Sequence, residues 1–150
     1  MKAKLYSLAA ILLFLNSCSK DNQQQGVPYV VVNFPEYLFQ YPQSKLQTPG
    51  NWIYVTGGSK GIIIYRIGIN VNGNDASNDF AVFDRNCTYE PLNGNAIVSV
   101  QSNNIYLIDS SCGSKFYIST GSVVNGPATL NLKAYRYSYD ASSLTLNVFN

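Results

Sequence analysis

Short runs of β-branched and aromatic residues, separated by turn residues, recur from residue 29 to the end of the chain. Examples are the runs at 52–56, 62–67 and 80–83. Such side chains favour strands, and regularly spaced short strands between turn residues are typical of an all-β sandwich or barrel. No stretch keeps a helical period. We therefore predict one all-β domain over residues 29–150.

The turns set the expected connections between strands. Residues 57–61, Gly-Gly-Ser-Lys-Gly, join the runs 52–56 and 62–67 and predict a hairpin. The second run is apolar without alternation, which predicts a strand covered on both faces. Residues 29–34 are expected to form the first strand, followed by irregular chain from Pro35. Residues 130–134 alternate and predict another strand, and the reversed alternation after Ala134 indicates a bulge or a change of sheet.

The N-terminus has the organisation of an exported protein. Lys2 and Lys4 precede an apolar run over residues 5–15, and Leu15-Asn16-Ser17-Cys18 follows. A basic start, a short apolar core and small residues before a cleavage point indicate a secretory signal peptide. The last four residues resemble the bacterial lipoprotein signal, which implies a signal peptide over 1–17 and lipid on Cys18. The alternative is a plain secretory signal with Cys18 free.

Polar residues 18–28 predict a flexible tether between lipid and domain. Serine after the lipid-bearing cysteine resembles the pattern of outer-membrane lipoproteins, so we expect a lipid-anchored protein of the cell envelope, in the outer membrane. Without Lys2 and Lys4, eight basic and eight acidic residues remain, which predicts no nucleic-acid partner. Exposed tyrosines are suited to contact an envelope protein or a glycan, but no particular partner is indicated.

Two turn-rich segments each carry one cysteine: residues 87–91, Cys-Thr-Tyr-Glu-Pro, and residues 109–116, Asp-Ser-Ser-Cys-Gly-Ser-Lys-Phe. Gly126-Pro127-Ala128 follows. This order resembles the loops of Rieske iron–sulfur proteins, where Cys-x-His and Cys-x-x-His-Gly-Ser-x-Phe hold a two-iron cluster under a proline-bearing loop. The resemblance covers about residues 50–150. It implies a Rieske-like antiparallel β-sandwich with a loop subdomain at the former cluster site.

The frame of these loops is kept, but the ligands differ. Cys87 stands at a cysteine position, Tyr89 and Cys112 stand where the family has histidine, and Asp109 stands where it has cysteine. The retained frame positions are Gly113, Ser114, Phe116, Gly126 and Pro127. A Rieske centre needs two histidines and two thiolates, and this chain has no histidine. The chain resembles Rieske-like lipoproteins of Bacteroidota that have lost these ligands, which implies no iron–sulfur cluster and no other metal.

The same resemblance implies a disulfide, because Cys87 and Cys112 occupy positions that face each other across the cluster space. If Cys18 carries lipid, these are the two remaining cysteines, and an exported protein meets an oxidising compartment. Two alternatives remain open. One is a reversible Cys87–Cys112 redox pair, and the other is a non-standard metal centre that also uses Tyr89 and Asp109.

Few residues suit catalysis. Without histidine there is no Ser-His or Cys-His pair, and a two-cysteine zinc site would need a carboxylate. Asp84 is expected to pair with Arg85, and Asp109 to act as a turn residue. Residues 70–79 carry many oxygens but lack the glycine and closing glutamate of a calcium loop. We therefore expect a non-enzymatic envelope lipoprotein whose degenerate domain is a binding or structural module. A redox or electron-transfer protein is the alternative.

The anchor is tested by Cys18→Ala, which removes the thiol that would carry lipid. We expect the variant to stay unprocessed or to leave the membrane fraction, as judged by intact mass and fractionation. A variant that stays with salt-washed membranes at the wild-type mass contradicts the anchor.

Overall fold

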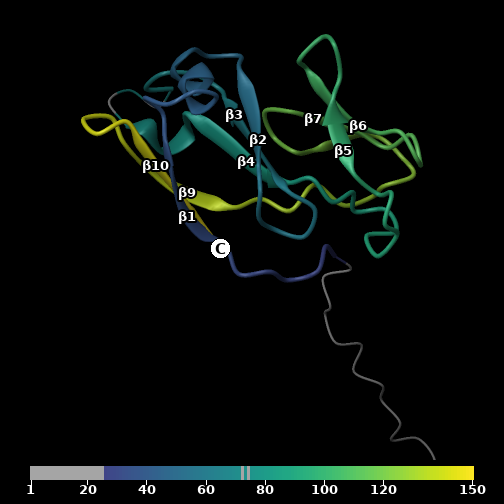
Figure 1. Cartoon of the computed structure of the whole chain (residues 1–150). Helices are drawn as coiled ribbons and strands as arrows, with labels where there is room; N and C mark the ends of the chain where they lie inside the picture. Colours follow the sequence, from purple (N-terminus) through teal and green to yellow (C-terminus); the bar gives the residue numbers. More distant parts are fainter. Residues whose placement is uncertain (1–25, 72, 74) are drawn as a thin grey trace, which may run out of the picture.

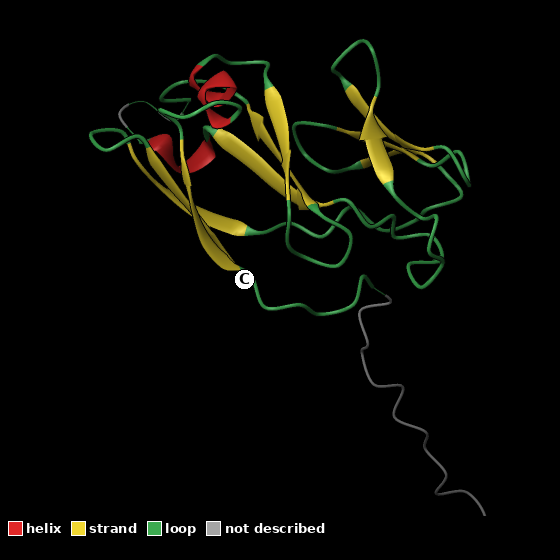
Figure 2. Ribbon diagram, in the orientation of Figure 1, coloured by secondary structure: helices red, strands yellow, loops and turns green. Residues whose placement is uncertain are grey.

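The computed structural model describes residues 26–71, 73 and 75–150. The predicted signal peptide, Cys18 and most of the predicted tether lie outside these residues, and the described end of the tether includes the buried Val27. In the described part, no helix is long and apolar enough to cross a membrane, and the helical turns are 3-10 (Figure 2). The elements are β1 (Asn33–Tyr37), η1 (Gln43–Gln47), β2 (Trp52–Val55), β3 (Ile62–Arg66), η2 (Ala76–Asn78), β4 (Phe80–Asp84), β5 (Val98–Val100), β6 (Tyr106–Asp109), β7 (Lys115–Tyr117), β8 (Val123–Asn125), β9 (Arg136–Asp140) and β10 (Thr145–Phe149).

The strands form three antiparallel sheets, ordered β1-β10-β9, β2-β3-β4 and β5-β6-β7-β8. Figure 1 shows β2, β3 and β4 between the other two sheets. The first two sheets enclose one apolar core, and the opposite face of the β2-β3-β4 sheet packs on the third sheet through a second core. The prediction of an all-β antiparallel sandwich with an added subdomain is therefore confirmed. The subdomain consists of β5–β8 and the loops around them.

Strand β3 lies between the two apolar cores, which accounts for its continuous apolar sequence. Ile62 and Ile64 face the first core, whereas Ile63 faces the second. Because successive side chains of a strand point to opposite faces, a strand between two cores must be apolar at every position. The prediction of a strand covered on both faces, and of its hairpin with β2, is correct.

Two strand predictions were wrong. The first strand was expected at 29–34, but β1 starts at Asn33 and includes Pro35. Proline lacks a backbone donor and is tolerated there because β1 is an edge strand, paired only with β10. Residues 130–134 form no strand, and Ala134 makes only an isolated bridge to Phe83. This segment carries the chain from one sheet to another, so the reversed alternation marks a change of sheet.

A buried carboxylate joins the β2–β3 turn to the end of β4. Asp84 Oδ2 accepts hydrogen bonds from the Ser59 amide at 2.6 Å and the Tyr135 hydroxyl at 2.8 Å. Its Oδ1 accepts from the amides of Asn86 at 2.8 Å and Lys60 at 3.3 Å. The carboxylate is fully buried, so these donors replace its lost hydration. Three segments of chain meet at this one side chain.

The expected Asp84–Arg85 ion pair is not formed. Arg85 instead stacks on the Tyr54 ring, 3.7 Å from its centroid, and donates to the Val98 carbonyl. Asp84 points into the protein toward Tyr135, because neighbouring residues of a strand face opposite sides. Burial, followed by the Asp84 carboxylate, raises the pKa of the Tyr135 phenol above its ordinary value. The phenol therefore stays a protonated donor.

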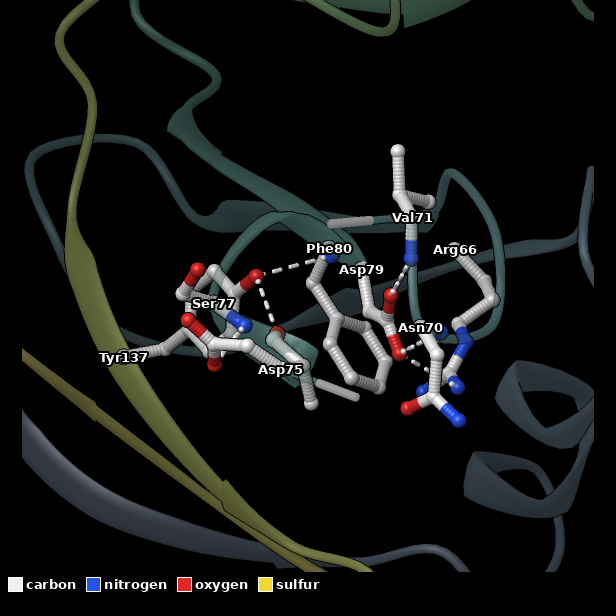
Figure 3. Close-up of polar contacts among 9 residues, drawn as sticks. Arg66, Asn70, Val71, Asp75, Ser77, Asp79, Phe80 and Tyr137 are labelled. Carbon is white, nitrogen blue, oxygen red and sulfur yellow. Dashed lines mark hydrogen bonds and ion pairs between the residues drawn. The ribbon is translucent and has the colours of Figure 1, made fainter. Parts of the chain in front are cut away.

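A second buried carboxylate closes the loop between β3 and β4 (Figure 3). Asp79 Oδ2 lies 3.1 Å from Arg66 Nη2, in an ion pair whose two side chains are almost fully buried. The amides of Asn70 and Val71 each donate to the Asp79 carboxylate at 2.9 Å, and the Arg66 guanidinium lies over the Phe80 ring. Asp79 is thus held by donors of the protein, as in an ordinary loop, rather than oriented for calcium.

The Asp84 network is tested by Tyr135→Phe, which removes one donor and keeps the ring. A hydrogen bond to a charged group contributes about 1.5–3 kcal/mol, so we expect a loss of that size in the free energy of unfolding by urea. Tyr139→Phe is the matched control on β9, since the Tyr139 hydroxyl has no hydrogen-bond partner among the described residues. Equal stability losses in both variants contradict the assigned role.

Candidate functional site

The predicted site residues that the structure describes lie in three loops of the subdomain and in the adjoining strands β6 and β7. We call residues 85–97, between β4 and β5, the first cysteine loop, and residues 110–114, between β6 and β7, the second cysteine loop. Residues 126–128, which follow β8, are the proline loop. Each loop begins or ends at a strand of the packed sheets, so the sheets fix where the loops meet.

The first cysteine loop is held by its neighbours in the sandwich. The Cys87 amide donates to the Ala96 carbonyl at 3.0 Å, which closes the loop on itself. The Asn86 side chain donates to the Pro91 carbonyl at 3.0 Å. Lys60 Nζ donates to the carbonyls of Asn93 and Ala96. Sequence analysis assigned Lys60 only to a hairpin turn, and no local signal marks its long-range role.

The second cysteine loop is a tight turn at the tip of the β6–β7 hairpin. The Gly113 amide donates to the Asp109 carbonyl at 2.8 Å, and the Asp109 amide donates to the Ser114 carbonyl at 3.0 Å. Gly113 has φ of +81°, a conformation that glycine adopts without strain. The Ala128 amide donates to Ser114 Oγ at 2.9 Å, which ties the proline loop to this turn. Phe116 lies fully buried in the second core.

Two thiols and one carboxylate converge where the loops meet. Cys87 Sγ lies 3.9 Å from Cys112 Sγ, and Cys112 Sγ lies 3.2 Å from Asp109 Oδ2. One ligand atom from each of the three residues lies within 4.8 Å of the other two. Cys87 and Asp109 are buried and Cys112 is partly exposed. We call these three side chains the Cys-Asp-Cys group.

The thiols are close but not bonded. A disulfide has an S–S distance of about 2.05 Å, and both cysteines are free thiols in this structure. The structure therefore brings together the two cysteines that the resemblance paired, and the disulfide itself stays a prediction.

The acid–base states of the group differ between its members. Burial raises the pKa of the Cys87 thiol to about 12, and the nearby Asp109 carboxylate adds to this, although the Tyr89 amide hydrogen bond opposes it. Burial would raise the pKa of Asp109 too. Hydrogen bonds from the Ser111 hydroxyl and amide, and from the thiols, outweigh burial and hold that pKa below its ordinary value. Near neutral pH, an ionised carboxylate thus faces a protonated Cys87 thiol.

The donor set does not fit a Rieske cluster. The four positions that correspond to its ligands hold Cys87, Tyr89, Asp109 and Cys112, which offer two sulfur donors and no imidazole. Carboxylate and phenolate are harder ligands than the thiolate and imidazole of such clusters. Tyr89 is also 37% exposed at the rim of the site, whereas the other three side chains gather below it.

Two clefts border the loops. A cleft of about 320 Å³ opens over Cys112 and is lined by Tyr89, Glu90, Asn93, Ala96, Ser111, Cys112 and Pro127. A wider cleft of about 860 Å³ lies between the first cysteine loop and the proline loop, with Leu92 and Leu130 in its lining. Leu92 is 86% exposed. Cys112 is therefore the member of the Cys-Asp-Cys group that borders a cleft.

No protein-family model and no curated protein matches this sequence. Thirty chains of solved structures resemble the fold. One is the plasma membrane Rieske protein PetC3 from Synechocystis PCC 6803, with a TM-score of 0.52 and 18% identity over 81% of this chain and 100% of that chain. Two others have lower TM-scores. The ferredoxin of carbazole 1,9a-dioxygenase from Nocardioides aromaticivorans IC177 has 0.42, with 13% identity over 68% of this chain and 86% of that one. The nitrite reductase small subunit described as putative from Mycobacterium tuberculosis has 0.43, with 14% identity over 81% and 97%. The likeness to PetC3 shows that this chain has the fold of a Rieske protein.

Proposed function

We propose that this chain is a non-enzymatic lipoprotein of the cell envelope, anchored in the outer membrane through Cys18. Its Rieske-like domain acts as a binding or structural module without an iron–sulfur cluster. The observation that carries the proposal is the donor set at the cluster position, two cysteines and one aspartate without imidazole. The likeness to a Rieske protein supports the proposed fold of the domain. The changed ligands argue against an iron–sulfur cluster as electron carrier.

The loops stay together through packing and hydrogen bonds rather than through a cluster. Cys87 and Phe116 belong to the same buried apolar core as Val98 and Leu107 of the neighbouring strands. The hydrogen bond from the Ala128 amide to Ser114 adds a direct link between the proline loop and the second cysteine loop. A rigid loop surface of this kind is suited to binding, because little ordering is needed when a partner docks.

The face that suits a partner is the wide cleft between the first cysteine loop and the proline loop. Leu92, Leu130 and Tyr89 are exposed around it. Aromatic and apolar side chains with polar neighbours are typical of the central part of a protein interface. An envelope protein or a glycan is the class of partner that the proposed location offers.

A redox role is the second candidate, and one observation favours it. Cys112 lies 3.9 Å from Cys87 and borders a cleft, so a dissolved thiol or disulfide can reach it. A reversible dithiol would need an attacking thiolate. Burial raises the pKa of Cys87 to about 12, which leaves that thiol a poor nucleophile and favours the structural role.

The absence of a cluster is tested on protein purified anaerobically from its own envelope. We expect a colourless protein with less than stoichiometric iron and acid-labile sulfide, because the site lacks the two imidazoles that a Rieske centre needs. Elemental analysis and visible absorption measure this directly. Stoichiometric iron and sulfide with visible charge-transfer bands contradict the proposal.

The structural disulfide is tested by thiol titration and by the double variant Cys87→Ser, Cys112→Ser. We expect no free thiols at these positions in protein from the envelope. The variant should lose about 2–5 kcal/mol of unfolding free energy, the range for removal of a native bridge. Wild-type protein melted with and without a reductant is the control. Two free thiols, or a reduction potential near that of thiol–disulfide oxidoreductases, would put the redox candidate first.

A further inference from the structure

We propose that the chain, when its two thiols are reduced, binds one zinc ion through Cys87, Cys112 and Asp109. The fourth coordination position would be open to the cleft over Cys112. The inference concerns the Cys-Asp-Cys group alone and does not depend on the proposed role as a binding or structural module. It departs from the expectation of no metal, and it differs from the non-standard centre considered above because it uses zinc and does not include Tyr89.

The distances within the Cys-Asp-Cys group fit tetrahedral zinc. Zinc binds sulfur at about 2.3 Å and carboxylate oxygen at about 2.0–2.2 Å, so the edges of its tetrahedron are about 3.8 Å between sulfurs and about 3.5 Å between sulfur and oxygen. The observed separations are 3.9 Å between Cys87 Sγ and Cys112 Sγ, and 3.2 Å between Cys112 Sγ and Asp109 Oδ2. The third pair lies within 4.8 Å. Only small shifts would complete the site.

Hydrogen bonds already orient two of the three ligands. The Ser114 amide, two residues after the cysteine, donates to Cys112 Sγ at 3.4 Å. The Ser111 amide and hydroxyl donate to Asp109 Oδ1 at 2.8 and 2.7 Å, which leaves Oδ2 facing the sulfur. Such outer contacts orient ligands and contribute to metal affinity.

The local charge also favours a cation. Asp109 is fully buried, yet it makes no ion pair with any lysine or arginine in the described part of the chain. Its Oδ1 accepts from Ser111, but its Oδ2 accepts from the Cys112 thiol, which is a weak donor, so a divalent ion at Oδ2 would replace a weak contact with a strong attraction to the carboxylate. Zinc binding would form two Zn–S bonds and release the two thiol protons.

The donor types select the metal. Two sulfurs and one oxygen suit zinc, whereas calcium and magnesium take oxygen ligands only. Three protein ligands with one open position are typical of exchangeable or reactive zinc sites rather than closed structural ones. The cleft over Cys112, about 320 Å³ in volume, gives water or a small anionic ligand access to that position. Oxidation of the thiols to a disulfide removes two ligands, so zinc and the bridge exclude each other.

The test is titration of the full-length chain, reduced and freed of metal, with Zn²⁺ and with Co²⁺ as a spectroscopic substitute. We expect one ion per chain, with visible bands of tetrahedral cobalt and a sulfur-to-cobalt charge-transfer band. Zinc should also protect Cys112 from alkylation. Asp109→Asn keeps the shape of the side chain and should weaken binding by roughly 10–100-fold or more, since even loss of an outer partner has an effect of that size.

Asp140→Asn is the matched control, because Asp140 also accepts hydrogen bonds from a serine two residues later but is exposed at the end of β9. Cys18→Ser controls for the third thiol. Both controls should bind as the wild type does. The inference is overturned if the reduced wild type binds no zinc, if Asp109→Asn binds with unchanged affinity, or if Cys18→Ser abolishes binding. Failure of zinc binding in a colourless protein leaves the proposed function standing, whereas iron and sulfide would overturn that proposal.

Discussion

The buried carboxylate of Asp84 is the contact on which the arrangement of the loops depends. It binds the amide of Ser59 in the β2–β3 turn, the Tyr135 hydroxyl ahead of β9, and the amide of Asn86 at the start of the first cysteine loop. Cys87 is the next residue, so the position of the first thiol follows from this network. Because a buried carboxylate without donors is costly, these partners cannot separate from Asp84 without a large loss of stability. The sandwich thereby fixes the position of the first cysteine loop.

The second cysteine loop is held by apolar packing against the β2-β3-β4 sheet, which lies between the other two sheets. Strand β3 presents Ile62 and Ile64 to one core and Ile63 to the other, and the second core includes Phe116 below the second cysteine loop. Cys87 itself packs in that core. Apolar packing on both sides of the middle sheet therefore contributes to holding the loops together. This explains how the fold of a Rieske protein is compatible with a changed ligand set.

The sequence predicted what depends on local pattern and on a recognisable frame. The apolar run around Ile63 identified a strand between two layers, and the order of the loop residues identified the fold. Local sequence patterns did not indicate the contacts between distant segments. The expected end of the first strand before Pro35 was wrong because only the sheet order shows that β1 is an edge strand. Asp84 was assigned to Arg85, since nothing local indicates that it faces Tyr135. Asp109 was assigned to a turn and, through the Rieske resemblance, to a former ligand position, but its contact with Cys112 depends on the β6–β7 hairpin.

The central claim is that a Rieske-like frame places two thiols and a carboxylate, instead of cluster ligands, at one point. The most direct measurement is the geometry of this group in crystals of the full-length protein, purified anaerobically and grown under reducing conditions without added metal or chelator. The account predicts about 3.9 Å between Cys87 Sγ and Cys112 Sγ, with Asp109 Oδ2 about 3.2 Å from Cys112 Sγ. Cysteines that point to opposite sides of the loops, or electron density for a two-iron cluster between them, would contradict it.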